Sequence, residues 1–169
     1  LLYVSSGEVY GIGDLSLESF DESYSGCVDV LSPRSCYPLS KRMTENLCAS
    51  YWKQYGVETV IVRPCHTYGP FMTESDNRAH AQFLQNAACG KKIVLKSLGT
   101  QMRSYNYVAD CSSALLSVLL SGNPGEAYNL ANSNSVLTIA DLAKKIASAV
   151  DCEVVFDIPN ATDLANQSP

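Results

Sequence analysis

The chain has 169 residues, of which 46% are hydrophobic and 17% charged, and it carries a formal net charge of −5 at pH 7. This length and composition are sufficient for a folded domain with one buried core, and they argue against an intrinsically disordered chain. The acidic balance argues against nucleic acid as a partner, because that binding depends on clustered Lys and Arg that release counterions from phosphates.

Signals for targeting, disulfides and metals are weak. The sequence has no run of about 18 apolar residues and no signal peptide at its first residues. We therefore expect a soluble, cytoplasmic protein that does not bind membranes. The seven cysteines include no Cys-x-x-Cys pair, so most are expected to be small buried side chains in a reducing compartment. The few histidines predict no metal site.

The first half of the chain predicts a strand, a helix and a second, parallel strand. Residues 1–4 form an apolar run without a starting Met, as expected of a fully buried strand in a fragment of a longer protein. Residues 11–34 lack periodicity, and a loop of that length is usually functional. Residues 35–55 predict a helix that ends at Gly56. Residues 57–62, rich in β-branched side chains, predict the second strand.

The second half continues this alternation and also stops soon after a new segment has begun. We expect helices over 76–88, 108–120 and 138–150, and strands over 93–95, 127–130 and 153–156. Thr138 and Asp141 form a variant of the capping box at the start of the last helix. The alternation predicts an α/β fold with a mostly parallel sheet and flanking helices.

Tyr37 and Lys41 are the first candidates for chemistry. They lie four residues apart on a predicted helix, so their side chains leave the same face. An ammonium beside a phenol stabilises the phenolate and favours a general base near neutral pH. Ser6 follows the first strand at the sheet edge where α/β proteins bind ligands, and its hydroxyl would share a substrate oxygen with Tyr37. A solvent-facing Tyr and Lys is the alternative interpretation.

Four ordered motifs resemble the extended short-chain dehydrogenase/reductase family of NAD-dependent nucleotide-sugar epimerases, dehydratases and decarboxylases. They are SSGEVYG at 5–11, YPLSK at 37–41, RPCHTYGP at 63–70 and RSYNYVAD at 103–110. The resemblance covers the second half of such an enzyme, without the glycine-rich turn that holds the NAD pyrophosphate. It implies a partial Rossmann-like sheet whose first half is missing.

The resemblance also implies a domain organisation. Residues 1–132 would form the catalytic second half of a Rossmann-like domain, with interleaved substrate-binding segments at about 63–106. Residues 133–169 would begin a C-terminal substrate lobe. The whole protein would be an enzyme and a homodimer.

Specific roles follow from the same resemblance. Tyr37 would take the proton of a sugar hydroxyl, Lys41 would hold the nicotinamide ribose, and Ser6 would orient the substrate oxygen. Residues expected near the cofactor or the UDP- or dTDP-linked substrate are Pro64, Cys65, His66, Arg78, Lys96, Gln101 and Arg103. For the charged members a solvated surface is the alternative, and for His66 a packed loop histidine.

Glu8 separates the branches of the family. Dehydratases usually have Asp then Glu after the catalytic hydroxyl residue, whereas this chain has Gly7 then Glu8. A glycine cannot donate a proton, so the resemblance favours a decarboxylase-like or epimerase-like enzyme that acts through a 4-keto sugar. Glu8 is included among the catalytic residues, with a purely structural loop carboxylate as its alternative. A 4,6-dehydratase, and a non-catalytic fragment or sugar-nucleotide scaffold unable to bind NAD alone, remain alternative functions.

Overall fold

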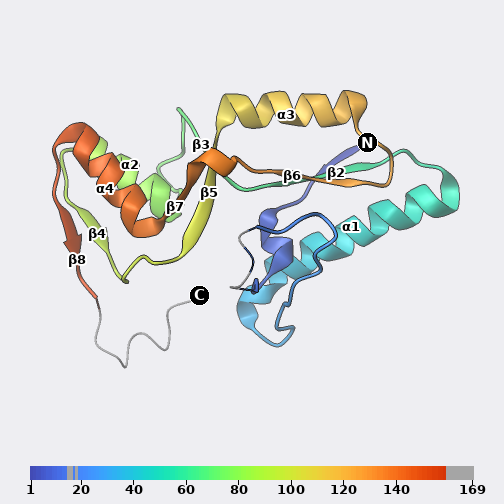
Figure 1. Ribbon diagram of the computed structural model, residues 1–169, viewed down its shortest axis with the longest axis horizontal. Coiled ribbons are helices and arrows are strands. Elements are labelled where there is room, and N and C mark those ends of the chain that lie inside the picture. The colour runs from blue at the N-terminus through green and yellow to red at the C-terminus, as the bar shows by residue number, and fades with distance from the viewer. Residues whose placement is uncertain (15–16, 18, 159–169) are drawn as a thin grey trace. The chain divides into compact units, whose positions relative to one another are not determined.

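A computed structural model describes residues 1–14, 17 and 19–158 (Figure 1). The chain divides into two compact units. The first contains Leu1–Thr67 and Asn106–Asn132, and the second contains Tyr68–Tyr105 and the described residues from Ser133 onward. None of the described helices combines the length and apolar character that crossing a membrane requires.

The first unit is a parallel sheet between two helices. Strands β1 (Leu2–Val4), β2 (Val60–Pro64) and β6 (Ala127–Leu130) pair in the order β1-β2-β6. Helices α1 (Cys36–Tyr55) and α3 (Val108–Ser121) flank these strands (Figure 1). The predicted α/β class, with a mostly parallel sheet and flanking helices, is confirmed.

Successive side chains of β2 point to opposite faces of the sheet, so the strand contacts both α1 and α3. Val62, which is fully buried, packs with Cys111 and Leu130 on the α3 side. Its neighbour Arg63 has the opposite orientation, and its side chain bonds Glu45 of α1. The sheet therefore has an apolar face under α3 and a partly polar face toward α1.

Two expectations for this sheet are corrected. Residues 1–4 were expected to form a fully buried strand, yet Val4 is 43% exposed. Among the described residues β1 pairs only with β2, so only one of its two edges is hydrogen-bonded to another strand. The second strand begins at Val60, and it includes Pro64, which pairs with Leu130.

Helix α1 ends as predicted. Gly56 adopts the left-handed conformation with φ of 67°, and its N–H bonds the carbonyl of Trp52 at 2.9 Å. At the other end Pro38 lies in the first turn, where a missing N–H costs no helical hydrogen bond.

The predicted loop over 11–34 contains more structure than its sequence suggests. The short 3-10 helix η1 (Gly7–Tyr10) precedes it, and η2 (Pro33–Ser35) closes it. Ile12 donates its N–H to Cys27 at 2.7 Å, which brings the two arms of the loop together.

The cysteines also differ from expectation. Only Cys48 and Cys111 are buried, whereas Cys27, Cys36 and Cys89 are exposed. The exposed cysteines lie in a loop or at the end of a helix, away from the buried core residues.

The second unit packs two helices against short strands. Its helices are α2 (Ala79–Ala88) and α4 (Ile139–Val150), and its strands include β4 (Ile93–Leu95), β8 (Val154–Phe156), β5 (Met102–Tyr107) and β7 (Val136–Thr138). Strand β4 pairs with β8 in parallel, and β5 pairs with β7 antiparallel. The core consists of Phe83, Ala87, Ile93, Leu95, Ala143 and Ala147.

The sequence predicted the start of α4 correctly but not the start of α2. Thr138 caps α4 as predicted, accepting the N–H of Asp141 at 3.0 Å. Helix α2 begins at Ala79 and not at 76, because the Asp76 carboxylate accepts the N–H of Arg78 and forms a turn before the helix. Strands β5, β7 and the short β3 (His66–Tyr68) were not predicted.

Candidate active site

Lys41 and Tyr37 lie on one face of α1, next to the carboxyl end of β1. The Lys41 Nζ donates to the carbonyl oxygen of Val4 at 2.9 Å. The same nitrogen lies 5.7 Å from the centroid of the Tyr37 ring and 5.1 Å from that of Tyr3. Both distances suit a cation–π contact, so the ammonium contacts two aromatic rings at the carboxyl end of β1.

Tyr37 is exposed to solvent. Its side chain is 45% exposed, and within the described residues no protein group hydrogen-bonds its hydroxyl. An exposed, unbonded phenol next to an ammonium is able to exchange a proton with a bound molecule.

Ser6 begins the turn that follows β1. Its Oγ caps η1 by accepting the N–H of Glu8 at 3.2 Å. Because the oxygen is the acceptor in this bond, the hydroxyl hydrogen remains available to a ligand. The carboxylate of Glu8 is exposed, and no hydrogen bond in the described structure joins Ser6 to Tyr37.

Ser5, next to Ser6 at the end of β1, was not among the residues expected from the sequence. It is only 3% exposed, its N–H bonds the carbonyl of Val62 at 2.7 Å, and its Oγ has no hydrogen-bond partner among the described residues. A buried hydroxyl without a partner costs about 1–3 kcal/mol. The sequence signal that could have pointed to Ser5 is its position directly after strand β1.

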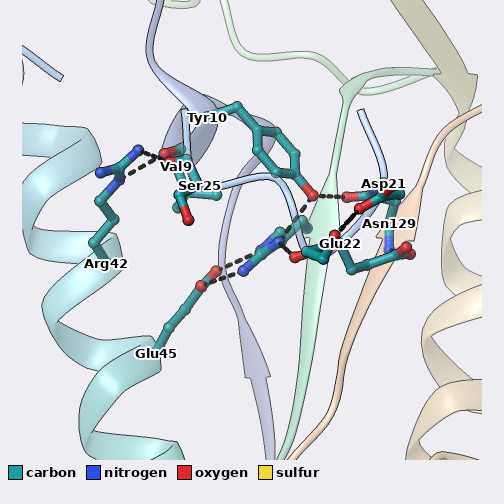
Figure 2. Close-up of polar contacts among 10 residues, drawn as sticks. Val9, Tyr10, Asp21, Glu22, Ser25, Arg42, Glu45 and Asn129 are labelled. Atoms are coloured by element: carbon teal, nitrogen blue, oxygen red, sulfur yellow. Dashed lines mark hydrogen bonds and ion pairs between the residues drawn. The ribbon is translucent and has the colours of Figure 1, made fainter. Parts of the chain in front are cut away.

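Two arginines hold the turn after Ser6 (Figure 2). Arg42 donates from Nε to the carbonyl of Val9 at 2.6 Å and from a terminal nitrogen to the carbonyl of Ser25. Arg63 donates to the hydroxyl oxygen of Tyr10 at 2.8 Å. Neither contact was expected from the sequence.

Arg63 is neutralised by Glu45 of α1. Its Nε and a terminal nitrogen bond the two carboxylate oxygens of Glu45 at 3.0 and 2.7 Å, and the two side chains are 12% and 11% exposed. These hydrogen bonds raise the pKa of Arg63 further above its ordinary value. Tyr10 in turn donates to Asn129 of β6 at 2.7 Å, so the network links α1, β2, β6 and the turn.

A cavity of about 380 Å³ lies beside this network. Arg42, Glu45 and Arg63 line it, together with Glu22 and Asn46, and Ser6, Tyr37 and Lys41 are not among its lining residues. The candidate catalytic groups therefore lie outside this cavity.

Three predicted residues follow one another at the end of β2. Pro64 is its last residue, and Cys65 donates its N–H to Leu130 at 3.0 Å. His66 begins β3 and is half-buried. Beside it, Thr67 donates to the Sγ of Cys111 at 3.7 Å. All of these residues belong to the same unit as Ser6, Tyr37 and Lys41.

The other four predicted residues belong to the second unit, where each has its own environment. Arg78 forms an ion pair with Asp76, which lowers the pKa of that carboxyl to about 2. Lys96 pairs with Asp157, and Arg103 donates to the carbonyl of Met102 at 2.8 Å. The Oε1 of Gln101 is buried without a hydrogen-bond partner among the described residues.

The donor set at the end of β1 fits the ribose of a nicotinamide cofactor. The Lys41 ammonium uses one hydrogen in its bond to Val4 and has two others to donate. The buried Ser5 hydroxyl has no hydrogen-bond partner among the described residues. Amines and hydroxyls are suitable partners for a sugar diol. In the described part of the chain, no group of three or more His, Cys, Asp or Glu residues could hold a metal ion.

Two curated relatives are similar to this chain over most of its length. UDP-glucuronic acid decarboxylase 1 of Xenopus tropicalis is 34% identical over 151 residues, covering 88% of the chain and 35% of the relative. dTDP-D-glucose 4,6-dehydratase of Homo sapiens is 32% identical over 169 residues, covering 99% of the chain and 45% of the relative. The chain thus spans less than half the length of these relatives.

A solved structure and a family model complete the comparison. The dTDP-glucose 4,6-dehydratase of Bacillus anthracis, in complex with NAD, superposes with a TM-score of 0.78 at 27% identity, over 98% of this chain and 54% of that one. The expected cofactor of the family, NAD, is therefore confirmed. The family model matches residues 1–131, and on this evidence the chain belongs to the NAD dependent epimerase/dehydratase family.

Proposed function

We propose that this chain supplies the catalytic and substrate-binding part of an NAD-dependent nucleotide-sugar enzyme that acts through a transient 4-keto sugar. The observation that carries the proposal is the Lys41 ammonium, which is fixed at the carboxyl end of β1 with the Tyr37 ring beside it. The relatives named above act on UDP- or dTDP-linked sugars, which supports a nucleotide sugar as the substrate.

Each residue has a distinct role in this proposal. NAD, when bound, supplies a reversible hydride acceptor for the C4 carbon of the sugar. The Tyr37 phenolate takes the proton of the C4 hydroxyl, while Lys41 stabilises the phenolate and holds the nicotinamide ribose. Ser6 donates a hydrogen bond to the C4 oxygen. Pro64 and Cys65 would border the nicotinamide.

The second unit would contribute to the substrate lobe. Arg103 would bind the diphosphate, because a guanidinium fork matches two phosphate oxygens. Arg78, Lys96 and Gln101 would bind the nucleotide, and the buried, unpartnered Oε1 of Gln101 supports a ligand contact at that position. His66, which belongs to the first unit, would also contact the substrate. Arg78 and Lys96 would first have to release Asp76 and Asp157.

The preferred reaction is decarboxylation of UDP-glucuronate, with 4-epimerisation as its close alternative. In decarboxylation the C4 ketone makes the substrate a β-keto acid, which loses carbon dioxide and leaves an enolate. The enolate takes a proton at C5, and the C4 ketone then regains the hydride at carbon and a proton at oxygen. Gly7 stands where dehydratases usually have an acidic residue, and a glycine cannot donate the proton that helps water leave, which disfavours dehydration. A dehydratase remains the second candidate, because 4,6-dehydratases are also among the similar relatives.

Product analysis of the whole protein separates these reactions. With UDP-glucuronate we expect a UDP-pentose and released carbon dioxide, because the β-keto acid breaks its carbon–carbon bond readily. UDP-glucose and dTDP-glucose should show no loss of water by mass spectrometry. A dehydrated dTDP-hexose, with UDP-glucuronate left intact, would instead establish the dehydratase, and an epimer of unchanged mass would establish the epimerase.

The same proposal includes a cytoplasmic location and a homodimer. The seven cysteines, all within the described residues, are free, which is typical of a reducing compartment. Met43, Leu47 and Tyr51 form a stripe on α1 and are 67%, 45% and 52% exposed. An apolar stripe at helical spacing on an exposed helix supports a contact with a second copy.

Replacing Leu47 with Glu should convert the whole protein from dimer to monomer, because it places a charge at the centre of this stripe. Light scattering measures the change. Leu120→Glu on α3, where the side chain is 81% exposed, is the matched control and should leave the dimer intact. A dimer that survives Leu47→Glu, or a monomeric parent protein, would place the association elsewhere or remove it.

A further inference from the structure

The turn that carries Ser6 and Glu8 is a single hydrogen-bonded unit. Val9 donates its N–H to the carbonyl of Ser6 at 3.2 Å, and Gly11 donates to the carbonyl of Glu8 at 3.0 Å. Val9 is only 3% exposed. Displacement of Val9 therefore displaces Ser6 as well.

The far side of this turn packs closely against a second loop segment. Gly26 has φ of 62°, and a Cβ at that position would lie 1.9 Å from the carbonyl oxygen of Tyr10. Only a glycine allows the two backbones to approach so closely. The carbonyls of Val9 and Ser25 are thereby brought within reach of one side chain.

Arg42 is that side chain. Its Nε donates to Val9 at 2.6 Å, and its terminal nitrogen donates to Ser25, as Figure 2 shows. A planar guanidinium has donors at fixed directions and serves both carbonyls at once, which the single ammonium of a lysine does less well. Arg42 follows Lys41 directly, so one stretch of helix holds both the ammonium and the turn.

We propose that Arg42 is a positioning residue that sets the place of the Ser6 hydroxyl relative to Tyr37 and Lys41. This inference rests on the proposed function, because it assigns Arg42 a task in the same site. Both of the Arg42 hydrogen bonds go to backbone carbonyls of the protein, so the residue acts through the turn and not on the substrate. Displacement of a catalytic group by about 1 Å lowers turnover by about 10²-fold.

The test compares Arg42→Met and Arg42→Lys in the whole protein, with Lys53→Gln as a control. Lys53 is exposed on the same helix, and its replacement removes the same charge. We expect Arg42→Met to lower kcat by about 10²-fold with little change in KM. We expect Arg42→Lys to recover part of that loss and Lys53→Gln to show none. Hydrogen exchange at the Val9 and Gly11 amides should speed up in Arg42→Met, independently of turnover.

Other outcomes would overturn the inference. A kcat for Arg42→Met close to that of the parent protein would do so, as would a lower melting temperature with unchanged kcat. If Arg42→Met does not fold, Arg42→Lys decides, and full kcat in that variant overturns the proposal. The Tyr37→Phe variant, measured in parallel, distinguishes failure of the proposed function from failure of the positioning role of Arg42. Retained turnover there defeats the proposed function, whereas lost turnover with a fully active Arg42→Met defeats only the positioning role.

Discussion

Replacing Tyr37 with Phe should abolish nearly all turnover of the whole protein and leave its melting temperature unchanged. The substitution removes only the hydroxyl, which has no hydrogen-bond partner among the described residues, and it keeps the ring that lies 5.7 Å from the Lys41 nitrogen. Loss of a general base typically lowers the rate by about 10²–10⁴-fold. Steady-state turnover of the nucleotide sugar at saturating NAD measures this effect.

A matched control for this prediction exists on the same helix. Tyr55 is 67% exposed and close to the carboxyl end of α1, about five turns from Tyr37. Tyr55→Phe should keep the parental rate. Because Tyr37 is 45% exposed and its hydroxyl makes no hydrogen bond to another described residue, a loss of folding cannot account for a loss of rate in its Phe variant. If Tyr37→Phe retains turnover, another group takes the proton.

The second large effect is expected on stability, at the ion pair of Glu45 with Arg63. Glu45→Gln leaves the guanidinium without its counter-charge in a site where the two side chains are 12% and 11% exposed. Breaking a buried pair costs about 3–5 kcal/mol. We expect the lower end, about 3 kcal/mol, because the hydrogen bonds of Arg63 to Tyr10 and to the Glu22 carbonyl remain. Urea unfolding of the whole protein measures the change in the free energy of unfolding.

Glu126→Gln provides the control for that measurement. Glu126 is exposed, and its hydrogen bonds in the described structure involve only its backbone. Its replacement should change the free energy of unfolding by less than about 0.5 kcal/mol. Equal effects of Glu45→Gln and Glu126→Gln would mean that the pair contributes nothing beyond a surface contact.

Much of the local structure could be predicted because it depends on neighbours in the chain. Helix α1 ends at Gly56, and α4 begins with the Thr138 cap, since both signals act within a few residues. Strand β7 was missed because its partner residues lie far away in sequence: Thr138 pairs with Met102. Pairing over such a separation is not encoded in any short window of residues.

The candidate site divides in the same way. The sequence alone predicts Ser6, Tyr37 and Lys41 as site residues, because a four-residue helical spacing and a polar residue after a strand are local patterns, and its motifs indicated the family. Only the tertiary structure revealed the buried Ser5 hydroxyl and the two arginine contacts to the turn. Arg42 reaches a carbonyl 33 residues away, and Arg63 reaches a hydroxyl 53 residues away. Backbone carbonyls occur at every position, so a contact with one of them leaves no mark on the sequence until folding brings the two segments together.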